Sequence, residues 1–197
     1  EKINSKIIIN NSRNKIEYLK NFKIDINLKN FSKKNLNKNK INNDLAYVLF
    51  TSGTTGEPKG VKLSYDNLLN TLNWSKKFLN WKKNDVIGIA TSFSFDISMF
   101  DLITSISLEK RCHIFSHPEN PIKSLNEIKR FKISSIFAVP SFFSNFIYYD
   151  LIAKNFYKLK RIISGGDFFP PKNIIEWHTN QKHIKIFNVW GPTATSI

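Results

Sequence analysis

The sequence predicts an α/β domain with a largely parallel sheet and flanking helices. From Asp44 onward, apolar stretches of strand length alternate with longer stretches whose apolar residues recur at helical spacing. This alternation is typical of parallel sheets, because each strand needs a crossover, usually a helix, before the next parallel strand. Glycine-rich or polar segments follow several of these strands, which is where open α/β sheets place their binding sites.

The expected elements follow the chain in order. An apolar strand is followed by a glycine-rich loop, and Ser64 then supplies an N-cap hydroxyl for the first helix. The later strands are continuous apolar runs, as expected for strands buried on both faces. Further strands are expected at 85–90, 112–115, 135–139, 159–164 and 184–188, after the first at 45–50. Further helices are expected at 99–108, 124–131, 141–150 and 171–178.

Residues 1–43 differ from the rest of the chain. They are rich in Lys and Asn and contain only two short strand candidates, at 6–9 and 22–26. We expect a flanking segment and linker at 1–43, followed by a domain at 44–197. Because the first residue is Glu1, we also expect the chain to be a fragment or a processed product.

Composition narrows the function classes. The chain has 30 Lys and Arg against 15 Asp and Glu, a formal charge of +15, yet the cations are spread beside Asn and Ile without a recognised nucleic-acid motif. We therefore expect no nucleic-acid partner; steeply salt-dependent binding to random duplex DNA would revive that alternative. A single cysteine, Cys112, excludes an internal disulfide, and we expect it to be a small core residue. The chain has no apolar run of about 20 residues and no signal peptide, so we expect no membrane span and a cytoplasmic protein.

The most informative segment is Thr51–Gly60, which follows the first strand. Its three glycines allow close approach of a ligand, and its hydroxyls and Lys59 offer donors to anionic oxygens. It lacks the G-x-x-x-x-G-K-[ST] spacing of the Walker loop. Together with Ala46 and Tyr47, it resembles the phosphate loop of adenylate-forming enzymes, the superfamily of acyl-CoA synthetases, luciferases and amino-acid adenylation domains.

This resemblance implies that residues 44–197 are part of the large N-terminal domain of such an enzyme, with ATP and Mg²⁺ as cofactors. In this family the loop binds the phosphates, and Thr54 and Lys59 are expected to assist the reaction. The nucleotide-binding residues implied in this loop are Thr51, Ser52, Gly53, Thr54, Thr55, Gly56 and Lys59.

A second motif, Phe95-Asp96-Ile97-Ser98, follows the strand at 85–90. Taken alone, Asp96 is most simply an N-cap of the following helix. The segment also resembles the F-D-x-S motif of amino-acid adenylation domains, in which the aspartate receives the α-ammonium group of the substrate. The resemblance therefore implies an amino-acid substrate.

Two further motifs line the expected nucleotide site. Gly165-Gly166-Asp167 follows a strand and resembles the family's G-G-E segment, and the segment from Asn188 resembles N-x-[YW]-G-P-T-E. In the second motif, Trp190 is the expected platform for adenine, and Thr193 is expected to contact the α-phosphate and assist catalysis. The implied nucleotide-binding residues here are Gly165, Gly166, Asp167, Asn188, Val189, Trp190, Gly191 and Thr193.

The family's substrate-pocket positions map onto a mostly apolar set. A small or apolar amino acid suits these walls, and the segment around Asp96 is especially similar to D-alanine:carrier-protein ligases. The expected substrate-binding residues are Phe95, Asp96, Ile97, Phe100, Ala138, Ile163, Gly165, Val189 and Ile197.

The last motif departs from the family at Ala194, where the family has a Mg²⁺-binding Glu. A methyl group cannot ligate a metal, so the metal ligands stay unassigned. Three alternatives remain open: a slow enzyme, a ligand from elsewhere, or a non-catalytic nucleotide-binding relative. The family's ribose-binding Asp, hinge and catalytic Lys are not found before Ile197, so we expect this chain alone to be inactive.

For the parent protein, the resemblance implies ATP-dependent formation of an aminoacyl-adenylate and its transfer to the phosphopantetheine thiol of a carrier protein. An acyl-CoA or other acid-thiol ligase of the same superfamily is the alternative. His113 and His117 are four residues apart, but they flank an expected strand and turn, which disfavours a zinc site.

Overall fold

The computed structural model describes residues 8–9, 21–22, 44–51, 57–145, 158–191 and 193. It divides into two compact units, Glu1–Asn42 and Asn43–Ile197. In the first unit, β1 (Ile8–Ile9) pairs in parallel with β2 (Asn21–Phe22), near the two expected short strands.

The second unit begins with a hairpin rather than a single strand. β3 (Leu45–Thr51) pairs antiparallel with β4 (Lys59–Ser64), although the latter segment was expected to belong to the loop and its exit. β4 forms because its main chain finds partners along β3, and because Leu63 is buried while the neighbouring Lys62 is exposed. The prediction for Ser64 is confirmed: its hydroxyl accepts from the Asn67 amide at 3.2 Å and starts α1 (Tyr65–Leu79).

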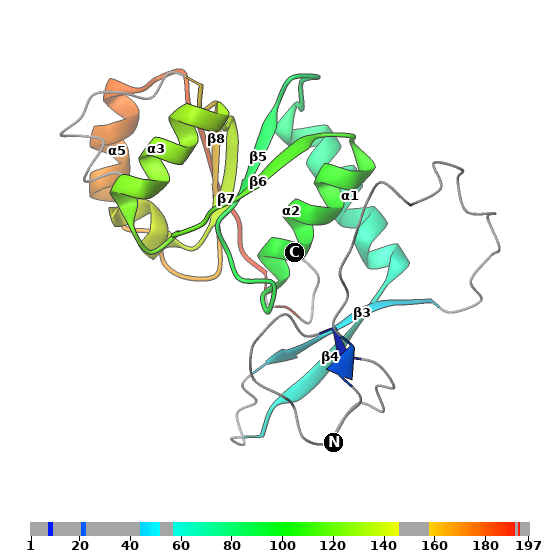
Figure 1. Ribbon diagram of the computed structural model, residues 1–197. Helices are drawn as coiled ribbons and strands as arrows, with labels where there is room; N and C mark the ends of the chain where they lie inside the picture. Colours follow the sequence, from blue (N-terminus) through cyan, green and yellow to red (C-terminus); the bar gives the residue numbers. More distant parts are fainter. Residues whose placement is uncertain are drawn as a thin grey trace. The chain divides into compact units, whose positions relative to one another are not determined.

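The predicted parallel sheet is confirmed. Its five strands run in the order β6-β5-β7-β8-β9, and every neighbouring pair is parallel (Figure 1). The strands are β5 (Val86–Ile89), β6 (Arg111–Ile114), β7 (Ser135–Ala138), β8 (Arg161–Ser164) and β9 (Lys185–Asn188).

Helices lie on both faces of the sheet. In Figure 1, α1 and α2 (Asp96–Ser107) lie on one side, and α3 (Pro121–Phe131) and α5 (Pro171–Asn180) on the other. Residues 140–145 are also helical, and the remainder of the helix expected at 141–150 lies outside the described residues. The early start of α3 has a plain cause, since the Asn120 side chain caps it and Pro121 suits its first turn.

Two hydrophobic cores explain why the central residues of β7 and β8 are apolar on both faces of the sheet. Ile136 and Ile162 pack with Leu125 and Ile128 of α3 on one face. The next residue of each strand, Phe137 and Ile163, packs with Ile97 and Phe100 of α2 on the other face. Successive side chains of a strand point to opposite faces, so a sheet covered twice needs apolar residues at both.

The edge strand β6 overturns one expectation. Cys112 is exposed rather than a core residue. Its neighbour Ile114, which shares its face of the strand, is also exposed. An edge strand has a partner on only one side, so its side chains are less well covered than those of β5 and β7.

Asp85, directly before β5, forms ion pairs that link β5 to the start of β8 at the amino end of the sheet. Its carboxylate lies 2.7 Å from the Lys160 ammonium and 2.7 Å from the Arg161 guanidinium. Arg161 also stacks on the Trp81 ring at 4.4 Å. Burial by itself raises the pKa of Asp85, but the hydrogen bonds from Lys160 and Lys82 and the charge of Arg161 outweigh it and lower the pKa to about 2.

The strand order reverses between β5 and β7. The chain passes from β5 to its outer neighbour β6 and then returns to β7 on the other side of β5. In open α/β sheets, ligands bind at the carboxyl ends of strands near such a reversal. No helix among the described residues is long and apolar enough to cross a membrane.

Candidate functional site

The segments after β8 and β9 form an open pocket of about 600 Å³. This volume lies within the range of sites for small molecules and cofactors. Trp190 is 90% exposed and Phe168 76% exposed, so two aromatic faces are available to a ligand at this pocket. Its lining residues are Gly166, Asp167, Phe168, Phe169, Asn188, Val189, Trp190 and Gly191.

This pocket brings together six of the eight residues expected to bind nucleotide at these two motifs. It also contains Phe168 and Phe169, which the motif comparison did not select. Their signal in the sequence was a pair of aromatic residues that follows Gly165-Gly166-Asp167, just beyond a strand end. Thr193 lies in a helical turn outside the lining set, and Ala194 lies outside the described residues.

A second, smaller cavity adjoins the first. It is lined by Asp96, Ile97, Phe137, Gly165, Gly166, Val189 and Gly191, and its volume is about 30 Å³. Gly166, Val189 and Gly191 also line the larger pocket, so the two spaces share a wall.

Both glycines of the pair have a structural requirement. A Cβ atom on Gly165 would lie 3.0 Å from Val189 Cγ2 and 3.1 Å from the Val189 carbonyl oxygen, so a side chain there would push against the residue that directly follows β9. Gly166 has φ of +90°, a conformation that L-residues with side chains rarely adopt. The chain can therefore turn tightly out of β8 and leave space beside Asp96.

Asp96 is the first residue of α2, and the N-cap is Phe95. The interpretation of Asp96 as an N-cap is therefore wrong, because Asp96 is already part of the helix, which starts three residues before the expected residue 99. The Asp96 carboxylate accepts a hydrogen bond from the Ile97 amide at 2.8 Å. Among the residues that the structure describes, no lysine, arginine or histidine lies within ion-pair distance of it.

The carboxylate also affects a neighbouring tyrosine. Burial and, secondly, the negative charge of Asp96 raise the pKa of Tyr47. The Tyr47 hydroxyl therefore stays protonated at neutral pH beside a carboxylate that has no described cation.

The remaining substrate-pocket residues divide into two groups. Phe100 and Ile163 are buried directly behind the cavity, where Phe100 packs edge-on against Phe137 at 5.3 Å. Ala138, in contrast, belongs to the core on the α3 face, and Phe95 is exposed, so neither lines the cavity. Ile197 lies outside the described residues.

The ends of the phosphate loop lie side by side. Thr51, the last residue of β3, is paired with Lys59, the first residue of β4. The hairpin therefore closes the loop at its base and leaves Lys59 exposed. The predicted residues Ser52, Gly53, Thr54, Thr55 and Gly56 lie outside the described residues.

His113 and His117 have separate partners and do not share a site. His113 pairs with Glu127 and stacks on Phe131, whereas His117 pairs with Glu119 at 3.1 Å. Within the described ranges, no group of three or more histidine, cysteine, aspartate or glutamate side chains is placed to hold a metal ion.

Comparison with known proteins gives a consistent assignment. The model of a family described as AMP-binding enzyme matches residues 4–197. The chain is 34% identical over 179 residues to bacitracin synthase 3 of Bacillus licheniformis, a match that covers 88% of this chain and 3% of that protein. It is 31% identical over 160 residues to the L-proline–[L-prolyl-carrier protein] ligase of Streptomyces coelicolor, covering 78% of this chain and 30% of that protein.

A solved structure supports the fold. The Vibrio cholerae adenylation domain AlmE, in complex with glycyl-adenosine-5'-phosphate, superposes with a TM-score of 0.68 at 21% identity. The match covers 80% of this chain and 30% of that chain. The chain thus spans less than a third of the length of each of these three proteins.

Proposed function

The chain belongs to the AMP-binding enzyme family, and from this premise we propose that the protein carrying it is an ATP-dependent ligase that activates an amino acid as an aminoacyl-adenylate. The adenylate would then be transferred to the thiol of a carrier protein. Transfer to a carrier is supported by the relative whose name specifies a prolyl-carrier protein.

One observation carries the proposal: the pocket at Trp190 and the cavity at Asp96 share Gly166, Val189 and Gly191. One space offers an exposed aromatic surface, and the other offers a carboxylate without a described cation. A base stacked on Trp190 and an ammonium group on Asp96 would be held on either side of this shared wall. The substrate carboxylate and the α-phosphate would then meet beside it.

The residues around this wall bind and orient rather than donate or accept protons. ATP supplies the phosphorus that the substrate carboxylate attacks, and pyrophosphate leaves as the new oxygen–phosphorus bond forms. Asp96 would hold the ammonium group by a charge-assisted hydrogen bond. Gly165 and Gly166 leave the turn after β8 without side chains. Binding both reactants beside this turn would bring the reacting groups together and so contribute to the rate enhancement.

The phosphate groups would be held by the loop between β3 and β4. Lys59 at its base is exposed and offers an ammonium group, and Thr54, Thr55 and Thr193 are the hydroxyls that we assign to the phosphates. The described residues offer no cluster of ligands for Mg²⁺. We therefore assign no metal ligand and derive no reaction step that depends on the metal.

The cavity next to Asp96 favours a small substrate. Its walls are apolar apart from Asp96, its volume is about 30 Å³, and Phe137 is one of its walls. We therefore propose a small or apolar amino acid, of either chirality.

The test is amino-acid-dependent exchange of labelled pyrophosphate into ATP by the full-length protein, with a panel of D- and L-amino acids. We expect exchange stimulated by one small amino acid. An Ala194→Glu variant measured in parallel shows how much the missing carboxylate costs. Exchange by this variant but not by the unmodified protein would identify a non-catalytic relative. The amino-acid proposal would be overturned if both proteins fold, neither shows exchange with any amino acid, and fatty or aryl acids stimulate exchange instead.

A further inference from the structure

α2 carries a second aspartate, which the proposed reaction does not use. Asp101 lies five residues after Asp96 and is 1% exposed. Its Oδ2 atom is buried and has no hydrogen-bond partner among the described residues. A buried carboxylate that is ionised and unpaired costs far more free energy than the neutral acid at the same place. The surroundings of Asp101 therefore favour its protonated form.

The hydroxyl groups closest to Asp101 along the helix are already used. Ser98 and Ser105 share its face of α2, because they lie three residues before it and four residues after it. Both serines are buried. Ser98 donates to the Phe95 carbonyl and Ser105 donates to the Asp101 carbonyl, each at 2.7 Å. A hydroxyl has one proton to donate, so neither serine is left to stabilise an ionised Asp101 side chain.

The elements that pack against α2 supply no counter-charge for Asp101. These elements are α1, β5, β6 and β7, and no ion pair in the described part of the chain includes Asp101. β5 and β7 contain no titratable side chain. The titratable side chains of α1 and β6 are exposed, except that of His113, which pairs with Glu127 of α3. They are Tyr65, Asp66, Lys76, Lys77, Arg111, Cys112 and His113.

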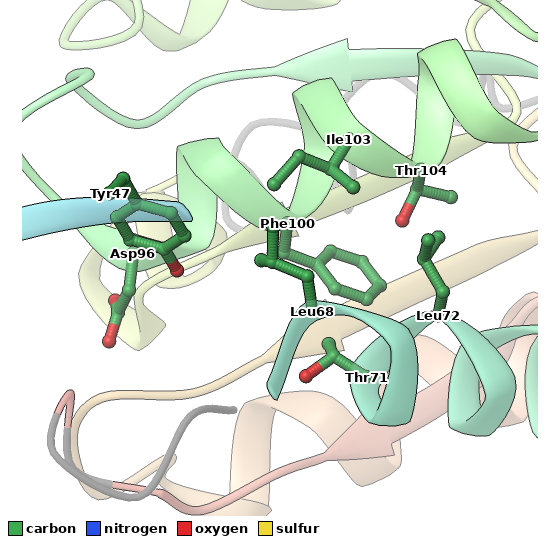
Figure 2. A pocket seen from close by; sticks show the side chains of 8 residues that line it. All are labelled: Tyr47, Leu68, Thr71, Leu72, Asp96, Phe100, Ile103 and Thr104. Atoms are coloured by element: carbon green, nitrogen blue, oxygen red, sulfur yellow. The ribbon is translucent and has the colours of Figure 1, made fainter. Parts of the chain in front are cut away.

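The side of α2 that faces α1 is mostly apolar. Figure 2 shows Phe100 of α2 facing Leu68 and Leu72 of α1. The space that they enclose is about 20 Å³, which is room for a single water molecule at most. The titratable groups of this space, Tyr47 and Asp96, lie at one end of it (Figure 2), and the negative charge of Asp96 would oppose a second one on the same helix.

Burial raises the pKa of Asp101 well above its ordinary value of 3.8. The folded chain therefore keeps a proton that the unfolded chain loses as the pH rises above about 4. The contribution of this group to stability is fully present below its ordinary pKa, decreases as the pH rises, and is lost above the pKa of the folded chain. Between the two pKa values, each pH unit changes the unfolding equilibrium constant about tenfold.

We propose that Asp101 is a pH-sensitive switch within α2: the neutral acid allows the helix to pack on the sheet, and ionisation loosens it. The start of the same helix carries Asp96 and Ile97, which line the cavity assigned above to the amino acid. Loosening of α2 therefore weakens amino-acid binding as the pH rises. This last step rests on the proposed function, whereas the effect on helix packing does not, so the two fail separately.

The experiment is urea denaturation of the unmodified chain and of Asp101→Asn between about pH 5 and about pH 9, a range in which Asp85 stays ionised. Asparagine has nearly the shape of aspartic acid and does not ionise. We expect the unfolding equilibrium constant of the unmodified chain to rise by up to about tenfold per pH unit relative to that of Asp101→Asn. Asp66→Asn, which changes an exposed aspartate of α1, is the matched control and should keep the pH dependence of the unmodified chain.

A measurement on the unmodified chain decides if Asp101→Asn does not fold. The ¹³Cγ resonance of an aspartate differs between the protonated and the ionised carboxyl group. At about pH 6, where an aspartate with its ordinary pKa is ionised, we expect the Asp101 resonance to report the protonated form.

Two results overturn the proposal. One is the same pH dependence of unfolding in the unmodified chain and in Asp101→Asn, and the other is an ionised Asp101 in the folded chain at about pH 6. The effect on the site is measured by calorimetric titration of the full-length protein with its amino acid at about pH 6 and about pH 8. We expect the affinity to fall about threefold in the unmodified protein and to stay constant in Asp101→Asn, because a smaller fraction of the protein is competent to bind. An equal fall in both proteins would overturn the effect on binding.

Discussion

Asp85 and Asp96 lie before and after β5, and they differ in burial and in ion pairing. Asp85 precedes β5, is 1% exposed, and meets two cations at 2.7 Å. Asp96 follows β5, is partly exposed, and has no cation within ion-pair distance among the described residues. The same side chain thus stabilises one end of the sheet and remains available at the other.

The two aspartates differ in their surroundings because the amino and carboxyl ends of a parallel sheet are built differently. At the amino end, Asp85 joins β5 to the start of β8 and fixes how the strands align. At the carboxyl end, the chain leaves each strand through segments such as Gly165-Gly166 that keep space open. Residues at the amino end should therefore affect stability, and residues at the carboxyl end should affect binding.

The largest expected effect is on stability at the amino end. Asp85→Asn leaves Arg161 buried without its counter-charge, so we expect the free energy of unfolding to fall by about 3 kcal/mol. Urea denaturation followed by circular dichroism measures this change. The matched control is Glu119→Gln, an exposed partner of His117, which should change stability by less than about 0.5 kcal/mol. Equal stabilities of the two variants would contradict the assigned role of Asp85.

The pH dependence of stability sharpens the same point. Because the pKa of Asp85 is about 2 in the folded chain and 3.8 is its ordinary value, its contribution is present above about pH 4 and is lost as the pH falls toward 2. The shift corresponds to about 2 kcal/mol. Urea denaturation at several pH values should show this loss in the unmodified chain and a smaller loss in Asp85→Asn. Parallel pH profiles for the two proteins would rule out Asp85 as the cause.

Asp96 should behave in the opposite way. Asp96→Asn keeps the shape but removes the charge, so we expect stability to stay within about 0.5 kcal/mol and the apparent affinity for the amino acid to fall at least tenfold. Pyrophosphate exchange by the full-length protein at varied amino-acid concentration measures the second quantity. A variant that is unstable but binds normally would reverse the comparison.

The tryptophans provide the smallest contrast. Trp190 is 90% exposed, so Trp190→Ala should leave stability unchanged and weaken ATP binding by about 1–2 kcal/mol through loss of stacking. Calorimetric titration with ATP, using the full-length protein, measures the loss. Trp81→Ala is the control, since that ring packs on Arg161 and donates to Ser75 at 2.8 Å, and it should lower stability instead. Unchanged ATP affinity in Trp190→Ala would remove Trp190 from the site.

The sequence predicted most of the fold because its signals are local. Continuous apolar runs located the strands, and Ser64 located the start of α1. The predictions of element bounds and of burial were wrong where contacts with distant segments outweigh local preference. β4 formed because β3 was available as a partner, α2 began early although Phe95 offers no capping side chain, and Cys112 is exposed because its strand lies at the sheet edge.

The candidate site was predictable in part. Motif resemblance selected Asp96, Gly165, Val189 and their neighbours, which line two adjoining spaces. It also selected Ala138, which lies on the other face of the sheet. Phe137, one residue earlier in β7, lines the cavity instead, because consecutive strand residues alternate between faces.

By itself, the sequence determined the fold class, the family and the chemical character of each motif, since periodicity and residue type are properties of short segments. The tertiary structure decided which of these residues meet. The different surroundings of Asp85 and Asp96 depend on contacts between segments that are distant in the chain. The shared wall at Gly166 and Val189 depends on such contacts too. No local pattern encodes those contacts, because they arise only when the strands align and the helices cover the sheet.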